Sequence, residues 1–333
     1  MNTANNEHTF AQYVRILGKG KTGTRALTID EASSAFAMIL RSDVEDVQLG
    51  AFLMLLRVKE ESAVEIAGFV QACRDALPAA PTGLGADLDW SSYAGKRHQH
   101  PWFVLSQLLI AEAGYSVLVH GSAGHTPGRL YTEQVIQTLG LPIATNWQQA
   151  GNALNTEKLC YMPLASLLPE LEALMQLKPL LGLRSPVNTL TRLLNPLAAA
   201  ASIQSVFHPA YAKIHQHADR LLQQPRALVF KGDSGEAEIK PQADTRLFYL
   251  IEGEHQEQLA SRTLQGRVAR VEQPQVEPLR RLWRGDSQDD YGLAATLGTA
   301  ATALVLLQPG LSQDQAAKQA AELWRKRNRE RLA

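Results

Sequence analysis

The sequence predicts an α/β protein in which a small all-helical domain precedes a larger domain with a mainly parallel central sheet flanked by helices. Three observations support this fold class. Residues 1–77 carry apolar side chains at helical spacing. A stretch rich in Pro and Gly, Leu77–Gly85, then forms a natural linker. After the linker, short apolar runs alternate with helical segments, as parallel strands alternate with crossover helices.

The helical domain contains clear start signals. Thr28 to Glu31 forms a capping box, in which the Thr28 hydroxyl accepts the backbone N–H of Glu31 and the Glu31 carboxylate reaches back. Val44–Val58 is strongly apolar, so we expect a helix that is buried on most sides. Ser62 opens a further helix that ends before Pro78.

The larger domain is expected to comprise residues 86–163 and 202–333. Short apolar runs predict strands at Tyr115–Val119, Leu141–Ala144, Leu159–Pro163, Ala227–Phe230 and Leu247–Ile251. Helical patterns occur at Trp102–Ala113 and Pro209–Leu222. The leucine-rich segment 164–201 is helical as well, and we expect it to join the helical domain of residues 1–77.

Composition and the amino-terminal segment favour a soluble cytoplasmic protein. Apolar residues make up 45% of the chain and charged residues 20%, which is ordinary for a globular protein. Residues 1–10 lack the apolar core of an export signal, and two cysteines are too few for a disulfide framework. The run Gly292–Leu307 is too short and too weakly apolar for a membrane span, so we expect a buried helix there.

Basic residues are clustered although the net charge of the chain is zero. Between Ala173 and Gly232 the only acid is Asp219, whereas the bases are Lys178, Arg184, Arg192, Lys213, Arg220, Arg226 and Lys231. A second cluster consists of Arg15, Lys19, Lys21 and Arg25. Such clusters are either solvated helix faces or the source of a local positive field that attracts a polyanion.

Two motifs look catalytic but lack the partners that catalysis needs. Gly232-Asp233-Ser234-Gly235 matches the tetrapeptide around many nucleophilic serines, yet nothing in the sequence ties a histidine to it. Gly18–Gly23 is similar to a phosphate-binding loop, but Arg15 stands where the first glycine of that loop belongs. We interpret the first motif as a turn after a strand and the second as a flexible basic loop.

The chain resembles the anthranilate phosphoribosyltransferase family over essentially its whole length. Residues 27–57 look like the helical domain of that family. Leu181-Gly182-Leu183-Arg184-Ser185, followed by Leu194-Asn195-Pro196-Leu197, resembles its Gly-Ile-Arg-Thr…Asn-Pro-Leu signature. His120-Gly121 falls in the family motif Lys-His-Gly-Asn-Arg. The resemblance implies the two-domain fold described above and a homodimer joined through the helical domains.

The family's substrate-binding positions are altered in this chain. The family holds phosphoribosyl pyrophosphate with a Gly-Thr-Gly-Gly-Asp loop, whereas the matching Tyr93-Ala94-Gly95-Lys96-Arg97 retains one glycine. The family's magnesium pair, Asp-Glu, matches Ala237-Glu238, and a single carboxylate holds magnesium poorly. The residues of a vestigial substrate cleft are Gly95, His120, Gly121, Arg184 and Glu238.

A similar departure is typical of the YbiB-type subgroup, which the loop Leu17–Arg25 also resembles. The resemblance implies a non-catalytic homodimer that binds DNA and RNA with little sequence preference and does not bind membranes. We predict no catalytic residue, no metal and no cofactor. The residues expected to contact phosphates are Lys19, Lys21, Arg25, Lys96, Arg97, Arg184 and Arg192.

Two alternatives stay open. The retained cleft residues would also suit a pentosyltransferase of the same superfamily that acts on a different phosphorylated sugar or nucleoside. A structural or regulatory protein could use the old cleft for another anion. Trp102 and Tyr93 are expected either to stack on exposed bases or to lie in the core.

Overall fold

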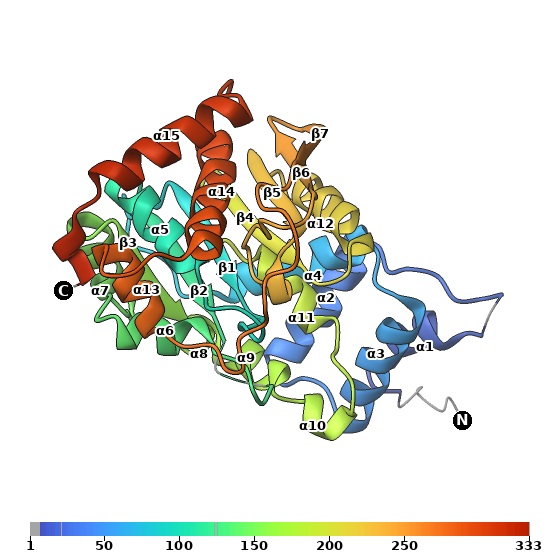
Figure 1. Cartoon of the computed structure of the whole chain (residues 1–333). Coiled ribbons are helices and arrows are strands. Elements are labelled where there is room, and N and C mark those ends of the chain that lie inside the picture. The colour runs from blue at the N-terminus through green and yellow to red at the C-terminus, as the bar shows by residue number, and fades with distance from the viewer. Residues whose placement is uncertain (1–6, 21, 123, 125, 333) are drawn as a thin grey trace, which may run out of the picture.

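The computed structural model describes residues 7–20, 22–122, 124 and 126–332, and it places a group of helices beside a larger part that contains a sheet (Figure 1). The first helices are α1 (Ala11–Gly18), α2 (Ile29–Leu40), α3 (Asp46–Lys59) and α4 (Ala63–Ala76). Capping boxes at Thr28 and Ser62 begin α2 and α4, which confirms both predicted starts. Gly68 lets α2 and α4 approach closely, because a Cβ there would lie 2.5 Å from the Ile29 carbonyl oxygen.

A seven-stranded sheet in the order β3-β2-β1-β4-β5-β6-β7 forms the centre of the larger part. Its strands are β1 (Leu88–Ser92), β2 (Val117–Gly121), β3 (Leu159–Pro163), β4 (Ala201–Val206), β5 (Arg226–Lys231), β6 (Thr245–Ile251) and β7 (Glu254–Ala260). β1 to β5 pair in parallel, whereas β6 and β7 are antiparallel additions at one edge. The predicted α/β fold class with a mainly parallel sheet is confirmed.

The apolar pattern of the sequence misses the two central strands. β1 reads Leu-Asp-Trp-Ser-Ser and β4 reads Ala-Ser-Ile-Gln-Ser-Val, so polar residues interrupt both runs. These polar residues are buried, and the Ser202 hydroxyl donates to Asp89 Oδ2 at 3.0 Å across the two strands. The strand expected at Leu141–Ala144 is wrong, because Ile143 forms only an isolated bridge with Tyr161.

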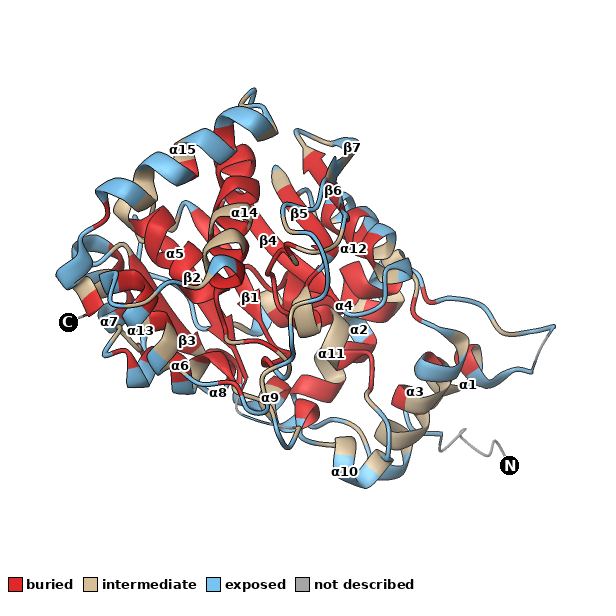
Figure 2. Ribbon diagram, in the orientation of Figure 1, coloured by how far each residue is buried: buried red, intermediate tan, exposed pale blue. Residues whose placement is uncertain are grey.

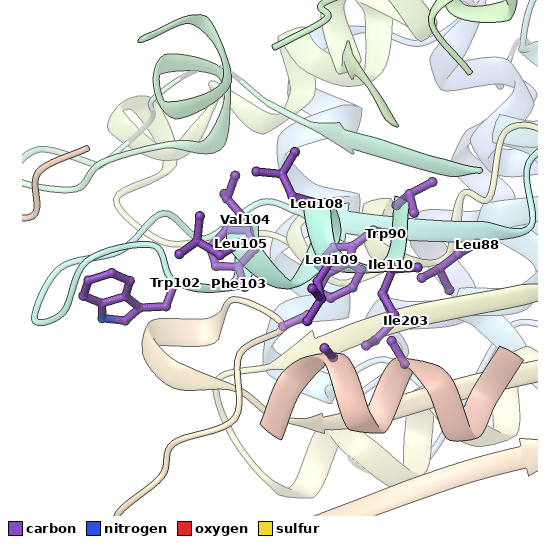
Figure 3. Packing of buried hydrophobic residues seen from close by; sticks show 14 of the residues in the cluster. Leu88, Trp90, Trp102, Phe103, Val104, Leu105, Leu108, Leu109, Ile110 and Ile203 are labelled. Carbon is purple, nitrogen blue, oxygen red and sulfur yellow. The ribbon is translucent and has the colours of Figure 1, made fainter. Parts of the chain in front are cut away.

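One face of the sheet is covered by α5 (Phe103–Glu112) and α14 (Asp290–Leu307). Buried side chains of α5 pack there against Trp90 of β1 and Ile203 of β4 (Figure 3). α14 is the one helix in the described part of the chain whose length and composition would let it cross a membrane. It is 72% buried inside the protein, as a core helix is, which agrees with the prediction for Gly292–Leu307 (Figure 2).

The other face carries α7 (Trp147–Thr156) and α12 (Ala210–Leu221). α7 packs on Leu118 and Cys160, and Ala212 of α12 packs against Val229 and Phe248. Further elements are α6 (Thr132–Thr138), α13 (Glu277–Arg284), α15 (Gln313–Lys326), η2 (Asp233–Gly235) and η3 (Arg329–Leu332). The core of the larger part therefore lies on both faces of the sheet, between layers of helices.

The segment after β3 packs with the first four helices. It contains short helices: α8 (Leu164–Leu167), α9 (Pro169–Met175), α10 (Lys178–Leu181), α11 (Val187–Leu190) and η1 (Thr191–Leu193). Leu171 and Leu190 are fully buried in the same apolar cluster as Phe36 and Phe69 of α2 and α4. This arrangement brings Arg184 and Arg192 back toward the edge of the sheet.

Candidate functional site

The carboxyl ends of β1, β2, β4 and β5 meet at one edge of the sheet. Because these strands are parallel, this edge is the usual place for a binding site in an α/β protein. Residues 93–97 follow β1, and residues 232–239 follow β5. Phe207 follows β4 directly. Two groups of charged residues lie at this edge. In one group the charges are buried and bound to partners within the chain, and in the other most basic side chains line hollows at the surface.

Lys96 is fully buried at this edge. Its Nζ donates hydrogen bonds to Asp233 and Glu238 and forms an ion pair with each carboxylate. The second carboxylate oxygen of Glu238 accepts the backbone N–H of Phe103 at 2.9 Å. Such partners are necessary, because a buried charge without a partner is strongly unfavourable.

The charges of Lys96, Asp233 and Glu238 depend on one another. Burial would lower the pKa of Lys96, but the two carboxylates outweigh burial and raise it, so the amine stays protonated. Burial would raise the pKa of Asp233, but Lys96 outweighs burial there and lowers it. Burial raises the pKa of Glu238 to about 7, although the charge of Lys96 opposes the shift. Asp233 is therefore ionised at neutral pH, and Glu238 is the member that titrates.

Glu236 closes the loop after β1. Its Oε1 accepts the backbone N–H groups of Ala94 and Gly95 at 2.7 and 2.5 Å, and its Oε2 accepts the Ser92 hydroxyl at 2.7 Å. Gly95 has φ = +68°, a left-handed backbone conformation that favours glycine. Successive backbone N–H groups in such a loop form an anion site. The chain supplies its own anion to that site.

Arg129 and Arg192 tie the same loops together through backbone carbonyl groups. Arg129 Nη1 donates to three carbonyl oxygens at 2.9 to 3.0 Å. Arg192 is buried, and its Nη1 donates to two carbonyl oxygens at 2.7 and 3.0 Å. We name these side chains the closed charge cluster: Lys96, Arg129, Arg192, Asp233, Glu236 and Glu238. Its three basic groups are matched by three carboxyl groups.

His120 and Gly121, at the end of β2, have structural partners. The Tyr93 hydroxyl and His120 Nδ1 share a hydrogen bond of 2.6 Å, and His120 Nε2 lies 3.2 Å from Asp89 Oδ1. A Cβ on Gly121 would lie 2.2 Å from the Ser92 carbonyl oxygen, so the close approach of β1 and β2 requires glycine. These two residues therefore have contacts within the sheet and with the loop after β1.

The closed charge cluster does not fit a magnesium ion. The Lys96 ammonium group lies between Asp233 and Glu238, and Ala237 stands at the position of the family's other acid. Magnesium requires several oxygen ligands in octahedral geometry, and an ammonium group among the same oxygens repels it. No group of three or more His, Cys, Asp or Glu suited to a metal occurs among the described residues.

Some residues predicted to contact phosphates are exposed. Lys19 and Arg97 are exposed, and Arg184 is half-buried in the lining of a hollow. Arg25 is exposed but forms an ion pair of 2.6 Å with an acid of α2. Lys21 lies outside the described residues. Neither Lys19 nor Arg97 lines the hollow that contains Arg184.

Two of the predicted residues are buried in the closed charge cluster, where carboxylates and carbonyl groups of the chain are their partners. Lys96 is fully buried, so a phosphate at the surface does not reach it. Arg192 also lines the hollow that contains Arg184, so its contact with phosphate stays a prediction. Trp102 and Tyr93 are also buried, which decides in favour of the core and against base stacking.

An open basic surface that the sequence pattern does not reveal surrounds Phe207, whose exposed fraction is 48%. Two hollows adjoin this side chain, with volumes of about 130 and 670 Å³. Apart from Arg192 of the closed charge cluster, the Lys and Arg residues along their walls are Arg57, Arg184, Lys213, Lys231, Lys240 and Arg246. We name Phe207 and these six residues the basic platform. Its aromatic member follows a strand that the sequence pattern does not predict.

Comparison with known proteins identifies the family. The helical bundle domain of the glycosyl transferase family matches residues 12–77, and the a/b domain of that family matches residues 104–326. The chain belongs to this glycosyl transferase family. The match covers every residue of the basic platform and, apart from Lys96, every residue of the closed charge cluster.

Relatives cover much of the chain. The uncharacterized protein YbiB of Escherichia coli (strain K12) is 30% identical over 241 residues, which span 70% of this chain and 73% of that protein. Anthranilate phosphoribosyltransferase of Sphingopyxis alaskensis is 29% identical over 212 residues, 63% of each chain. The chain therefore spans less than two thirds of that enzyme's length.

Solved structures show the same fold. Anthranilate phosphoribosyltransferase of Thermus thermophilus has a TM-score of 0.79 at 20% identity, covering 96% of this chain and 94% of that chain. The Saccharomyces cerevisiae enzyme in complex with PRPP and Mg has a TM-score of 0.79 at 18% identity, covering 98% and 96%. Anthranilate phosphoribosyltransferases thus resemble this chain in both sequence and fold.

Proposed function

We propose that this protein is a non-catalytic DNA- and RNA-binding protein with little sequence preference, built on a phosphoribosyltransferase scaffold. The closed charge cluster is the observation that carries the proposal. An enzyme cleft must leave its anion and metal positions free for the substrate. Here the Glu236 carboxylate holds the backbone N–H groups, and the Lys96 ammonium group lies between the acids. A substrate would have to break buried ion pairs, which is strongly unfavourable.

The basic platform supports the second half of the proposal. Within the described part of the chain, five of its basic residues make no ion pair: Arg57, Arg184, Lys213, Lys231 and Lys240. Exposed cations that contact phosphates give affinity and salt dependence but read no base sequence. Lys19 and Arg97 would add contacts outside the platform.

The proposed assembly is a homodimer. Val47 and Val58 of α3 and Leu180 of α10 are 79, 82 and 85% exposed, and both helices lie on the same side of the molecule (Figure 1). Exposed apolar side chains that gather on one side usually mark an interface. A twofold axis would duplicate the basic platform and lengthen the surface that a polyanion can contact.

Titration of labelled oligonucleotides with the full chain across a salt series tests the proposal. We expect similar affinity for unrelated sequences of the same form. The logarithm of the binding constant should fall with the logarithm of salt concentration, with a slope of about −0.9 per phosphate on duplex DNA and about −0.7 on single strands. Phosphoribosyl pyrophosphate should not displace the oligonucleotide. Affinity that is independent of salt, or confined to one sequence, would contradict the proposal.

A parallel assay examines catalysis with anthranilate, phosphoribosyl pyrophosphate and Mg²⁺. We expect no turnover above a blank, because the anion and metal positions are occupied by the chain. Turnover that is lost in Glu238→Ala, combined with no oligonucleotide binding at low salt, would replace the proposal with the pentosyltransferase alternative.

A further inference from the structure

Phe207 is a half-exposed aromatic side chain in a position that packing does not explain. It stands between the end of β4 and the start of α12, and it lines both hollows of the basic platform. Its ring contacts His208 in an edge-on arrangement, with the ring centroids 5.0 Å apart. An aromatic face that is open to solvent between two cationic hollows is an unusual use of a large apolar residue.

The smaller hollow is positively charged. Arg57 and Arg184 line it, and the Arg57 guanidinium donates to the Tyr211 hydroxyl at 3.3 Å. The carboxylate in its wall, Glu61, is buried and accepts the Thr189 hydroxyl at 2.8 Å. With Arg192 of the closed charge cluster, the hollow therefore has three cations in its lining and one acid whose Oε1 is already bound.

The larger hollow is also positively charged. Lys213, Lys231 and Lys240 line it and make no ion pair with any described residue. Its acids are engaged elsewhere, because Asp233 is bound to the closed charge cluster and Asp244 accepts the backbone N–H of Arg262 at 2.9 Å. Its volume of about 670 Å³ lies within the range of sites that hold small organic ligands.

We propose that Phe207 is a stacking platform for one unpaired base, and that the two hollows hold the sugar-phosphate backbone on either side of that base. The inference rests on the proposed function and narrows it to nucleic acid with exposed bases, namely single strands, loops or ends. A ring flanked by cations matches the alternation of base and phosphate along a single strand. Stacking accepts any base, because every base has a π-face, so sequence tolerance is retained.

Equilibrium binding of Phe207→Ala, Phe207→Trp and Leu221→Ala to three ligands tests the inference. The ligands are a single-stranded oligonucleotide, an abasic strand with the same number of phosphates, and a blunt duplex. Leu221 is the matched control, because it is 42% exposed and lies at the far end of α12, roughly 16 Å along the helix from Ala210.

We expect the unmodified protein to bind the single strand about 5- to 150-fold more tightly than the abasic strand, the range that stacking of one base gives. Phe207→Ala should lose this preference and keep the affinity for the abasic strand. Phe207→Trp should retain the preference, and Leu221→Ala should behave as the unmodified protein does. A 2-aminopurine in the single strand should be quenched on binding by the unmodified protein and not by Phe207→Ala.

Three outcomes would overturn the inference. Equal affinity for the single strand and the abasic strand would reject base stacking and leave the proposed phosphate binding intact. An unchanged preference in Phe207→Ala would reject this residue as the platform. No binding of any ligand at low salt would reject the proposed function as well. Thermal unfolding of each variant checks that it is folded. If Phe207→Ala does not fold, Phe207→Leu takes its place, and we expect this variant to lose the preference for the single strand over the abasic strand.

Discussion

The closed charge cluster and the basic platform lie at the same edge of the sheet, yet their basic residues behave in opposite ways. In the cluster, Lys96 binds two carboxylates and is fully buried. On the platform, Lys231 makes no ion pair with any described residue and is exposed. Asp233 belongs to the cluster and also lines the larger hollow, so the two regions meet at this side chain.

The comparison separates cations that hold the protein together from cations that are free for a ligand. A buried ion pair is weak support for stability as a whole, but removing one partner is strongly destabilising. An exposed cation contributes little to stability and keeps its charge for an outside anion. The basic stretch between Ala173 and Gly232 contains both kinds of cation, because Arg192 is buried and bound within the chain whereas Lys231 is exposed.

The largest expected difference between the two regions concerns stability. Lys96→Met should lower the free energy of unfolding by about 3–5 kcal/mol at pH 8, because it leaves Asp233 and the buried Glu238 without a counter-charge. Lys231→Met should change it by less than about 0.5 kcal/mol. Denaturant unfolding of both variants measures the two values.

The destabilisation caused by Lys96→Met should also depend on pH, because Glu238 can take up a proton. Burial already raises the pKa of Glu238 to about 7, and loss of Lys96 removes the charge that opposes the shift. Glu238 would then be neutral below that pH, so the Lys96→Met penalty should be smaller at pH 5 than at pH 8. A penalty that is equal at both pH values would contradict the ion-pair account of this cluster.

Glu236 offers a test of whether the chain occupies an anion site. Glu236→Ala removes the acceptor of the Ala94 and Gly95 N–H groups, and we expect a loss of about 1.5–3 kcal/mol, the usual contribution of a hydrogen bond to a charged group. Inorganic phosphate or pyrophosphate should then raise the unfolding temperature of the variant more than that of the unmodified protein. Equal responses would show that Glu236 does not hold a site that external anions can use.

A second buried polar group consists of Gln204, His215 and Asp219. It predicts how the free energy of unfolding depends on pH. The Gln204 carboxamide bonds both His215 and Asp219, with contacts of 2.9 Å to His215 Nδ1 and 2.8 Å to Asp219 Oδ1. Burial lowers the pKa of His215 to about 3 and raises the pKa of Asp219 to about 7. The unfolded chain binds one more proton than the folded protein at His215 between about pH 3 and 6.5, and one fewer at Asp219 between about pH 4 and 7. The two contributions nearly cancel.

Single substitutions should expose each contribution. Relative to the unmodified protein, Asp219→Asn removes a contribution that falls as pH rises, so its slope of unfolding free energy against pH should be more positive by about 1.4 kcal/mol per pH unit between about pH 4 and 7. His215→Gln removes the opposite contribution, so its slope should be more negative by about the same amount between about pH 4 and 6.5, and the contribution of Glu238 is common to all three proteins. Denaturant unfolding between pH 4.5 and 7.5 distinguishes the two slopes, and identical slopes in both variants would contradict this assignment.

The smallest expected effect is on the salt dependence of binding. Lys231→Gln combined with Lys240→Gln should weaken binding to all sequences and flatten the salt slope by about 0.7 for each lost contact on single strands. Lys318→Gln is the matched control, because Lys318 is exposed on α15, on the opposite side of the sheet from α12 (Figure 1). An unchanged slope in the double variant would remove these lysines from the binding surface.

Local patterns in the sequence predict much of the fold. The starts of α2 and α4 depend on side chains three residues apart, and β3 has the predicted bounds because its apolar run is continuous. β1 and β4 escape prediction because their polar residues are satisfied only by partners on other segments, such as Asp89 by Ser202. The segment Leu141–Ala144 has the reverse problem, since its apolar residues pack without joining the sheet ladder beyond one bridge.

By itself the sequence determines the fold class and the family motifs, and it predicts that the family's phosphate loop and metal pair are altered, because each of these lies within a short stretch of chain. The tertiary structure alone decides which basic residues are free. Lys96 meets Asp233 and Glu238 across more than a hundred residues, whereas Lys231, two positions before Asp233, faces the hollow beside Phe207. Charge is a property of a residue, but its neutralisation depends on which carboxylate the folded chain places within a few ångströms.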